Sequence, residues 1–215
     1  MRTVVLASGR GSNLRALVEA AVDGPGGASI VGVVSDRPGC EALVFAEERG
    51  IATRAVPLRA YASRELWDAA LAQAVRELDP QLVVLAGFMK IVGPPLLEAY
   101  PGRIINIHPS LLPAFAGKDG PADALAAGVR ITGCTVHVVD TGLDSGPILA
   151  QAAVVVLPDD DRASLHARIQ RVEHRLLPSV VAWIATGAIE LSPLHIRVEC
   201  DARVPALVCP PIALK

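Results

Sequence analysis

Three side chains of complementary chemistry stand near two proline-containing turns. Asn106 and His108 lie two positions apart in the string 105–113, and Asp144 lies in a later turn, 140–147. An amide can donate to a developing oxyanion, and an imidazole can hold or move a proton near neutral pH. A carboxylate can orient the imidazole and stabilise its charged form. Together these groups suit acyl transfer.

The spacing of Asn106 and His108 predicts how a strand would present them. Side chains at positions i and i+2 of a strand project to the same face, so the end of an apolar strand over 103–107 could aim both at one substrate atom. The alternative is a capped strand end with a buried histidine and a polar turn at Asp144. Ser110 has no G-x-S-x-G motif around it, so a covalent seryl intermediate is not expected.

The elements that must position these residues alternate between strand and helix. Short apolar strands are expected at 3–7, 30–35, 53–56, 82–86 and 103–107, and late strands at 133–139 and 148–156 are expected to pair. Helical spacing marks 14–22, 41–49, the stretch after Ser63 up to Pro80, and 122–127. A long helix follows Asp159–Asp161, with Leu165, Ile169, Val172, Leu176, Val180 and Ile184 on its buried face. The pattern predicts one α/β domain with a Rossmann-like, mostly parallel sheet and helices on both faces.

A glycine-rich loop at 8–13 follows the first strand and opens the first helix. Glycine lets the backbone approach an anion, and the amide groups at a helix start can hold phosphate. A dinucleotide fingerprint is one alternative, with Asp36 as the ribose-binding acid, but Leu14 occupies the third glycine position. A purely structural turn is another.

The string 106–113, followed by Leu143–Ile148, resembles the folate-dependent formyltransferases, and within them the branch acting on glycinamide ribonucleotide. The resemblance covers about residues 3–187 and implies the formyltransferase fold. It implies direct transfer of a formyl group from 10-formyltetrahydrofolate, the co-substrate, to the amine of phosphoribosylglycinamide in purine biosynthesis. Asn106, His108 and Asp144 would be catalytic.

The resemblance also assigns two sets of binding residues. The phosphate and ribonucleotide of the acceptor would be bound by Gly11, Ser12, Asn13, Gln170, Arg171, Val172 and Glu173. The folate would be bound by Arg64, Met89, Lys90, Ile91, Val92, Asn106, Asp140, Thr141, Gly142, Leu143 and Asp144. The alternative for Arg64 is an exposed helix arginine, and for Glu173 it is a solvent-facing carboxylate. For the segment 85–92 it is a core strand running into a loop. Phosphate is expected at the amino-terminal half and folate at the carboxy-terminal half of a domain spanning 1–187.

Two segments depart from the family pattern. Lys90 stands where arginine is usual, which keeps the charge but loses the planar fork. The polar loop 117–121 lacks the usual histidine, which affects the expected loop closure and folate contact. The tail 188–215 shows no motif of the family.

Composition and residue spacing limit the partners, the location and the metal sites that are expected for this chain. The chain has 215 residues, a net charge of −2, 52% hydrophobic residues and four scattered cysteines. Nucleic acid and membrane are therefore not expected as partners, the cysteines are expected to be reduced, and the expected location is the cytoplasm. Histidine and cysteine spacings predict no metal. A monomer or homodimer acting on small molecules is expected. The alternative functions are a formyltetrahydrofolate hydrolase or a tRNA formyltransferase, and each of these enzymes is expected to carry a further domain. A silent folate- or nucleotide-binding module is the remaining alternative.

Overall fold

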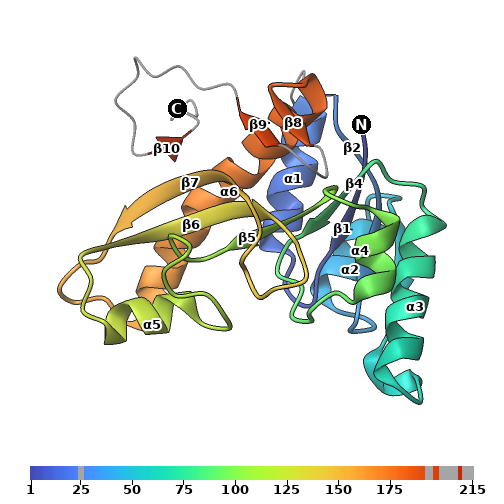
Figure 1. Cartoon of the computed structure of the whole chain (residues 1–215), viewed down its shortest axis with the longest axis horizontal. Coiled ribbons are helices and arrows are strands. Elements are labelled where there is room, and N and C mark those ends of the chain that lie inside the picture. Colours follow the sequence, from blue (N-terminus) through green and yellow to red (C-terminus); the bar gives the residue numbers. More distant parts are fainter. Residues whose placement is uncertain (24–26, 192–195, 199–207, 210–215) are drawn as a thin grey trace. The chain divides into compact units, whose positions relative to one another are not determined.

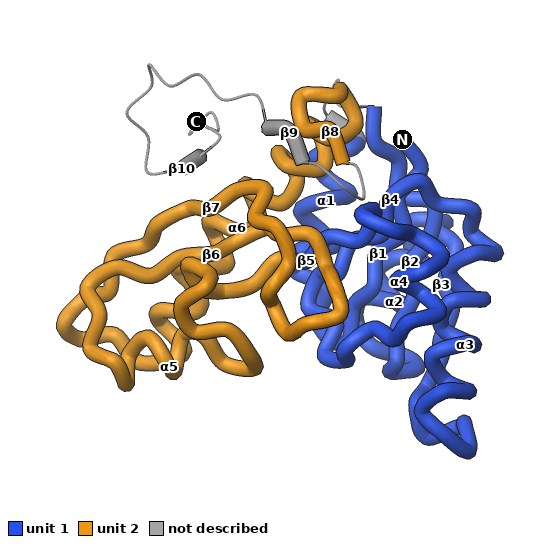
Figure 2. The backbone as a smooth tube through the Cα atoms, viewed as in Figure 1, with its two compact units in different colours: residues 1–106 blue, residues 107–215 orange. Residues whose placement is uncertain are grey.

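The structure is a computed structural model that describes residues 1–23, 27–191, 196–198 and 208–209 (Figure 1). The chain divides into two compact units, residues 1–106 and 107–215 (Figure 2). The division falls within one strand, β5 (Ile104–His108). Whether residues 1–187 act as a single domain stays a prediction.

The first unit is built on parallel strands. They are β1 (Arg2–Leu6), β2 (Ser29–Ser35), β3 (Ala52–Ala55), β4 (Leu82–Leu85) and β5 (Ile104–His108). β1 pairs in parallel with β2 and β4, β2 with β3, and β4 with β5. β4 is buried along its whole length, which is why its sequence is a continuous apolar run.

Helices connect these strands and cover their apolar side chains. They are α1 (Ser12–Asp23), α2 (Glu41–Glu47), the short 3-10 turn Leu58–Ala60, α3 (Arg64–Arg76) and α4 (Pro94–Ala99). Ser63 caps α3 as expected, since its hydroxyl accepts from the backbone N–H of Leu66 at 3.3 Å. The sequence analysis did not predict α4, because six residues with one buried side chain, Leu96, are too few to show helical periodicity.

The second unit combines two long strands with helices. β6 (Ile131–Val138) and β7 (Ile148–Val155) pair antiparallel, as expected, and α6 (Arg162–Thr186) contacts both. α5 (Gly120–Ala126) begins at Gly120 and not at Ala122, because Asp119 caps it and Pro121 fits its first turn. Together with β10 (Val208–Cys209), the strands hydrogen-bond in the order β10-β7-β6-β5-β4-β1-β2-β3, so the expected α/β class with a mostly parallel sheet is confirmed.

α6 follows Asp159–Asp161 as expected, and Asp161 is its N-cap, in a reciprocal capping box with Ser164. One expectation for α6 needs correction. Its buried face includes Glu173, while Val172 is only half-buried. A glutamate at a core position is invisible to a search for apolar periodicity.

The tail contributes short strands that no sequence motif predicted. β8 (Ile189–Leu191) pairs antiparallel with β9 (Ile196–Val198), and β10 (Val208–Cys209) pairs antiparallel with β7. The prolines of the tail lie outside the described residues.

Candidate active site

Two of the three expected catalytic side chains meet in the second unit, joined by a second histidine. Nδ1 of His108 lies 3.4 Å from Oδ2 of Asp144, and Nε2 of His137 lies 3.6 Å from Oδ1 of the same carboxylate. All three are largely buried: the exposed fractions of the side chains are 5%, 11% and 2%. A carboxylate placed between two imidazoles can orient both rings and stabilise a positive charge on either.

The turn that presents Asp144 is tightly constrained. Asp140 accepts hydrogen bonds from the Gly142 N–H at 3.0 Å and the Ser145 hydroxyl at 2.9 Å, which closes the turn. A Cβ added to Gly146 would lie 1.9 Å from the carbonyl oxygen of Val138, so only glycine fits there. Asp144 itself adopts a left-handed conformation with φ of 51°, uncommon for a residue with a side chain. Such backbone constraint often accompanies a functional site.

The environment of Asp144 holds it in the charged form. Burial disfavours the carboxylate, but hydrogen bonds from His137 and from the Gly117 N–H, with the charges of His108 and His137, lower the pKa of Asp144 below its ordinary value. The Gly117 N–H donates to Oδ2 at 2.9 Å. Asp144 is therefore a permanent anion at neutral pH.

The other edge of the His108 ring is also occupied. Its Nε2 lies 2.9 Å from the carbonyl oxygen of Phe115, in the loop that follows the histidine. With Asp144 at Nδ1, both ring nitrogens face acceptors. Only a ring that carries two protons donates to both.

Asn106 is placed by the strand itself. β5 carries Asn106 and His108 two positions apart, so the alternation of the strand directs both side chains to one of its faces. In the pairing with β4, Asn106 lies opposite Leu85. The strand on which the sequence analysis depended is thus present.

The glycine loop of the first unit has the expected form. Gly11 has φ of 70°, and a Cβ there would lie 2.8 Å from the Cβ of Ala42, so the turn requires glycine. α1 begins directly afterwards at Ser12, and Asn13 is buried. The first amide groups of a twelve-residue helix suit a phosphate group.

Asp36 is engaged by the same loop, which bears on the dinucleotide alternative. The Ser8 hydroxyl donates to the carboxylate of Asp36 and accepts from the Met89 N–H at 2.9 Å. A ribose-binding acid would need to offer its carboxylate to hydroxyl groups of a ligand. Here Asp36 fastens the glycine loop, and Ser8 fastens it to the segment after β4.

That segment, 85–92, presents alternate side chains to different surroundings. Met89 and Ile91 are both 62% exposed, whereas Phe88 and Val92 are buried. The exposed pair offers apolar side chains at the surface, and contact of this pair with folate stays a prediction. Val92 contributes to the core, so any part that it has in binding is through its backbone.

Arg64, expected to bind folate, already has protein partners. Its Nε lies 2.9 and 3.0 Å from the two carboxylate oxygens of Asp68, and its Nη2 donates to the carbonyl oxygen of Ile91. The guanidinium also lies over the ring of Trp67, 4.8 Å from its centre. These contacts tie α3 to the segment 85–92, and contact with folate stays a prediction.

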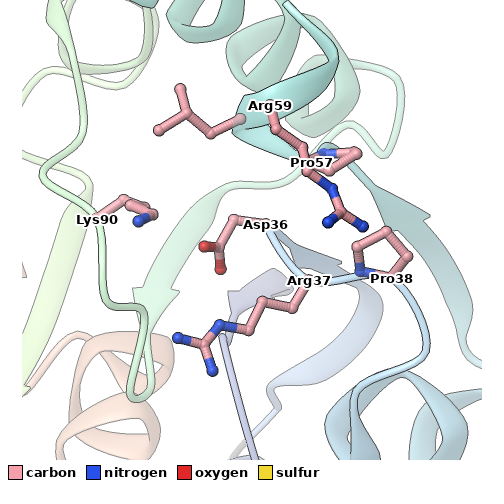
Figure 3. Close-up of a pocket in the computed structure, with 7 residues that line it drawn as sticks. Asp36, Arg37, Pro38, Pro57, Arg59 and Lys90 are labelled. Carbon is pink, nitrogen blue, oxygen red and sulfur yellow. The ribbon is translucent and has the colours of Figure 1, made fainter.

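A cavity of about 530 Å³ lies at the carboxyl ends of β2, β3 and β4 (Figure 3). Lys90, Arg37 and Arg59 line it with Asp36, and three prolyl and leucyl side chains, Pro38, Pro57 and Leu58, complete the wall. Ligands of open α/β sheets bind at this edge. Three cations against one carboxylate favour an anionic group. Binding of folate by Lys90 stays a prediction.

The segment 170–173 of α6 is divided between core and surface. Glu173 is 4% exposed, so the alternative of a solvent-facing carboxylate is wrong, while Arg171 is exposed. Burial, with the negative charge of Glu173 as the second cause, raises the pKa of the Cys134 thiol. Cys134 is a free cysteine, and its raised pKa keeps the thiol neutral.

The sequence analysis missed His137, Arg37 and Arg59. It weighed His137 only as a metal ligand, although its position on the strand leading into the Asp140 turn could have indicated a partner for Asp144. Arg37 lies two residues past the end of β2, and Arg59 lies four residues past the end of β3. Such strand ends are where this fold binds ligands. Within the described ranges, no three histidine, cysteine or acidic residues gather as a metal site would require, and no helix is long and apolar enough to cross a membrane.

Most of this chain is similar in sequence and structure to known proteins. Residues 1–181 match the family model described as formyl transferase. A phosphoribosylglycinamide formyltransferase of Mycobacterium tuberculosis is 51% identical over 188 residues, covering 87% of this chain and 86% of that protein. The Bacillus subtilis protein of the same name is 41% identical, over 82% and 91% of the two chains. A crystal structure of glycinamide ribonucleotide transformylase 1 from Symbiobacterium toebii matches with a TM-score of 0.88 and 41% identity, over 92% and 93% of the chains.

Proposed function

The chain belongs to the formyl transferase family, and on this premise we propose that it transfers a formyl group from 10-formyltetrahydrofolate to the amine of phosphoribosylglycinamide. The observation that carries the proposal is the buried cluster of His108, Asp144 and His137, which can stabilise an oxyanion and move a proton. The names of the similar proteins support the same acceptor. A role in purine biosynthesis is supported by 43% identity over 194 residues to a trifunctional purine biosynthetic protein of Drosophila melanogaster.

In the proposed mechanism the amine nitrogen attacks the formyl carbon, and the carbonyl electron pair moves to oxygen. The amide of Asn106 and the Nδ1–H of a protonated His108 donate to this oxyanion, while Nε2 keeps its contact with the Phe115 carbonyl. As the oxyanion collapses, the bond from carbon to N10 of the folate breaks. The attacking nitrogen loses one proton and N10 gains one, and His108 is the group that carries it. Asp144 holds the ring and balances its charge.

The remaining residues would bind and align the two substrates. Gly11, Ser12 and Asn13 would hold the phosphate, and Glu173 the acceptor amine. The folate ring system would lie against the segment 89–92 and the turn 140–144. Because the transfer needs no acyl-enzyme, alignment of the two reactants supplies much of the rate.

The test is an assay with purified protein, 10-formyltetrahydrofolate and phosphoribosylglycinamide, following the loss of the formyl group from the folate. We expect turnover that depends on the acceptor, and that persists with a metal chelator. His108→Ala should abolish it, and Asp159→Asn, on an exposed carboxylate, should not. Formyl release to water without the acceptor would instead indicate a hydrolase. Transfer to initiator methionyl-tRNA would indicate the tRNA enzyme.

A further inference from the structure

A polar cluster fixes the middle of the loop that follows His108. The Thr135 hydroxyl on β6 donates to the carbonyl oxygen of Ser110 at 2.7 Å and accepts from the Leu112 N–H at 3.0 Å. Gln151 on β7 donates through Nε2 to the carbonyl oxygen of Leu112 at 2.8 Å and to the Thr135 hydroxyl at 3.0 Å. Thr135 and Gln151 are directly opposite one another in the β6–β7 pair.

The hydroxyl of Thr135 and the side-chain nitrogen of Gln151 use all of their hydrogen-bonding positions. A hydroxyl has one donor and two acceptor positions, and Thr135 fills all three. An amide nitrogen has two donors, and both of those of Gln151 are engaged. Since the carbonyl of Leu112 can only accept, the nitrogen of Gln151, and not its oxygen, must face it. The cluster therefore requires an amide at position 151.

The end of the same loop reaches the catalytic groups. Three residues past Leu112, the carbonyl of Phe115 meets Nε2 of His108, and the Gly117 N–H meets Oδ2 of Asp144. Phe115 has φ of 57°, so the loop holds an uncommon conformation at the residue that contacts the histidine. The Ser110 hydroxyl supports this bend by donating to the carbonyl oxygen of Ala114 at 2.6 Å.

We propose that Gln151 and Thr135 are positioning residues: by fixing the 109–117 loop on β6 and β7, they place the Phe115 carbonyl against Nε2 of His108. The role in catalysis rests on the proposed function, but the placement itself does not. Without the cluster the loop shifts, Nε2 loses its acceptor, and His108 no longer presents a fixed ring to the formyl group.

The test uses two variants that keep shape and remove donors. Gln151→Glu sets an oxygen against the Leu112 carbonyl, and Thr135→Val removes the hydroxyl. We expect each to lower kcat by about 10², the scale of a displacement of about 1 Å in an aligned site, with little change in either KM. In ¹H–¹⁵N spectra of the full chain, recorded without substrates, the hydrogen-bonded Nε2–H signal of His108 should disappear.

Two further variants separate positioning from a general loss of stability. Thr135→Ser keeps the hydroxyl and should restore both kcat and the Nε2–H signal. Thr132→Val is the matched control on β6, because Thr132 is buried and its hydroxyl has no hydrogen-bond partner within the described residues. It should behave as wild type. All measurements are made below the melting midpoint of each variant.

Retention of the His108 signal and of kcat in Gln151→Glu would overturn the proposal, as would equal losses in Thr132→Val. If Gln151→Glu does not fold, the comparison of Thr135→Val with Thr135→Ser decides. If wild type shows the Nε2–H signal and the variants lose it, but wild type transfers no formyl group, the proposed function is refuted. The positioning role then still stands.

Discussion

Asp144→Asn is the substitution that most directly examines the catalytic cluster, because it keeps the shape of the side chain and removes its charge. The carboxylate serves His108 and the Gly117 N–H through one oxygen and His137 through the other. An amide has a single oxygen and no charge. Its NH₂ group would meet the Gly117 N–H donor against donor if it turned that way, and turned toward His137 it needs a neutral ring nitrogen as acceptor. Whichever way the amide turns, the substitution removes the anion that balances a protonated histidine.

Losing one stabilising or proton-transferring group typically costs about 10² in kcat, which corresponds to about 2.7 kcal/mol of the barrier. We expect a loss of this size or more, with both KM values little changed. A buried donor left without a partner also costs roughly 1–3 kcal/mol of stability. For a protein of this length that lowers the melting midpoint by about 2–12 °C.

The assay is a cycle of wild type, His108→Ala, Asp144→Asn and the double variant, with kcat and melting midpoint measured for each. Because the two residues act as one unit, the double variant should be no slower than His108→Ala. Asp159→Asn serves as the charge-matched control on an exposed residue. Strictly multiplicative losses would show that Asp144 acts independently of His108. A large fall in midpoint without a specific loss of kcat would assign both residues to stability alone.

Three other outcomes follow from separate parts of the structure. Hydrogen bonds from Arg168 hold the pKa of Asp160 far below its ordinary value, so the stability they give is present above about pH 4 and is lost as pH falls through the lowered pKa. Asp160→Asn should therefore lower the melting midpoint at pH 7, and its difference from wild type should shrink in acid; a constant difference would contradict this. Asn13→Leu should raise the KM for phosphoribosylglycinamide far more than that for the folate, and equal effects would refute separate binding regions. Lys90→Ala should raise the KM for the folate by roughly tenfold with kcat retained, since it removes a cation from an anion-binding cavity; an unchanged KM would remove Lys90 from the folate site.

Local features of this protein were predictable from the sequence because each depends on residues close together in the chain. The alternation that sets Asn106 and His108 on one face of β5 is a property of any strand. The Ser63 cap, the apolar run of β4 and the glycine turn at Gly11 likewise follow from local backbone geometry. The family resemblance indicated the substrates on which these features are expected to act.

The contacts that complete the site depend on which strands pair and in what register, and these are decided only in the folded chain. His137 meets Asp144, and Gln151 meets Thr135, through the β6–β7 pair, while Glu173 is buried in a helix face otherwise made of apolar residues. The partner of His108 at Nε2 is the backbone carbonyl of Phe115, a group that every residue carries and that no residue type can reveal. The sequence by itself determined which chemical groups are available and their local directions. Tertiary structure decided their partners, because burial makes each unmet polar group costly and so selects the arrangement in which these groups meet.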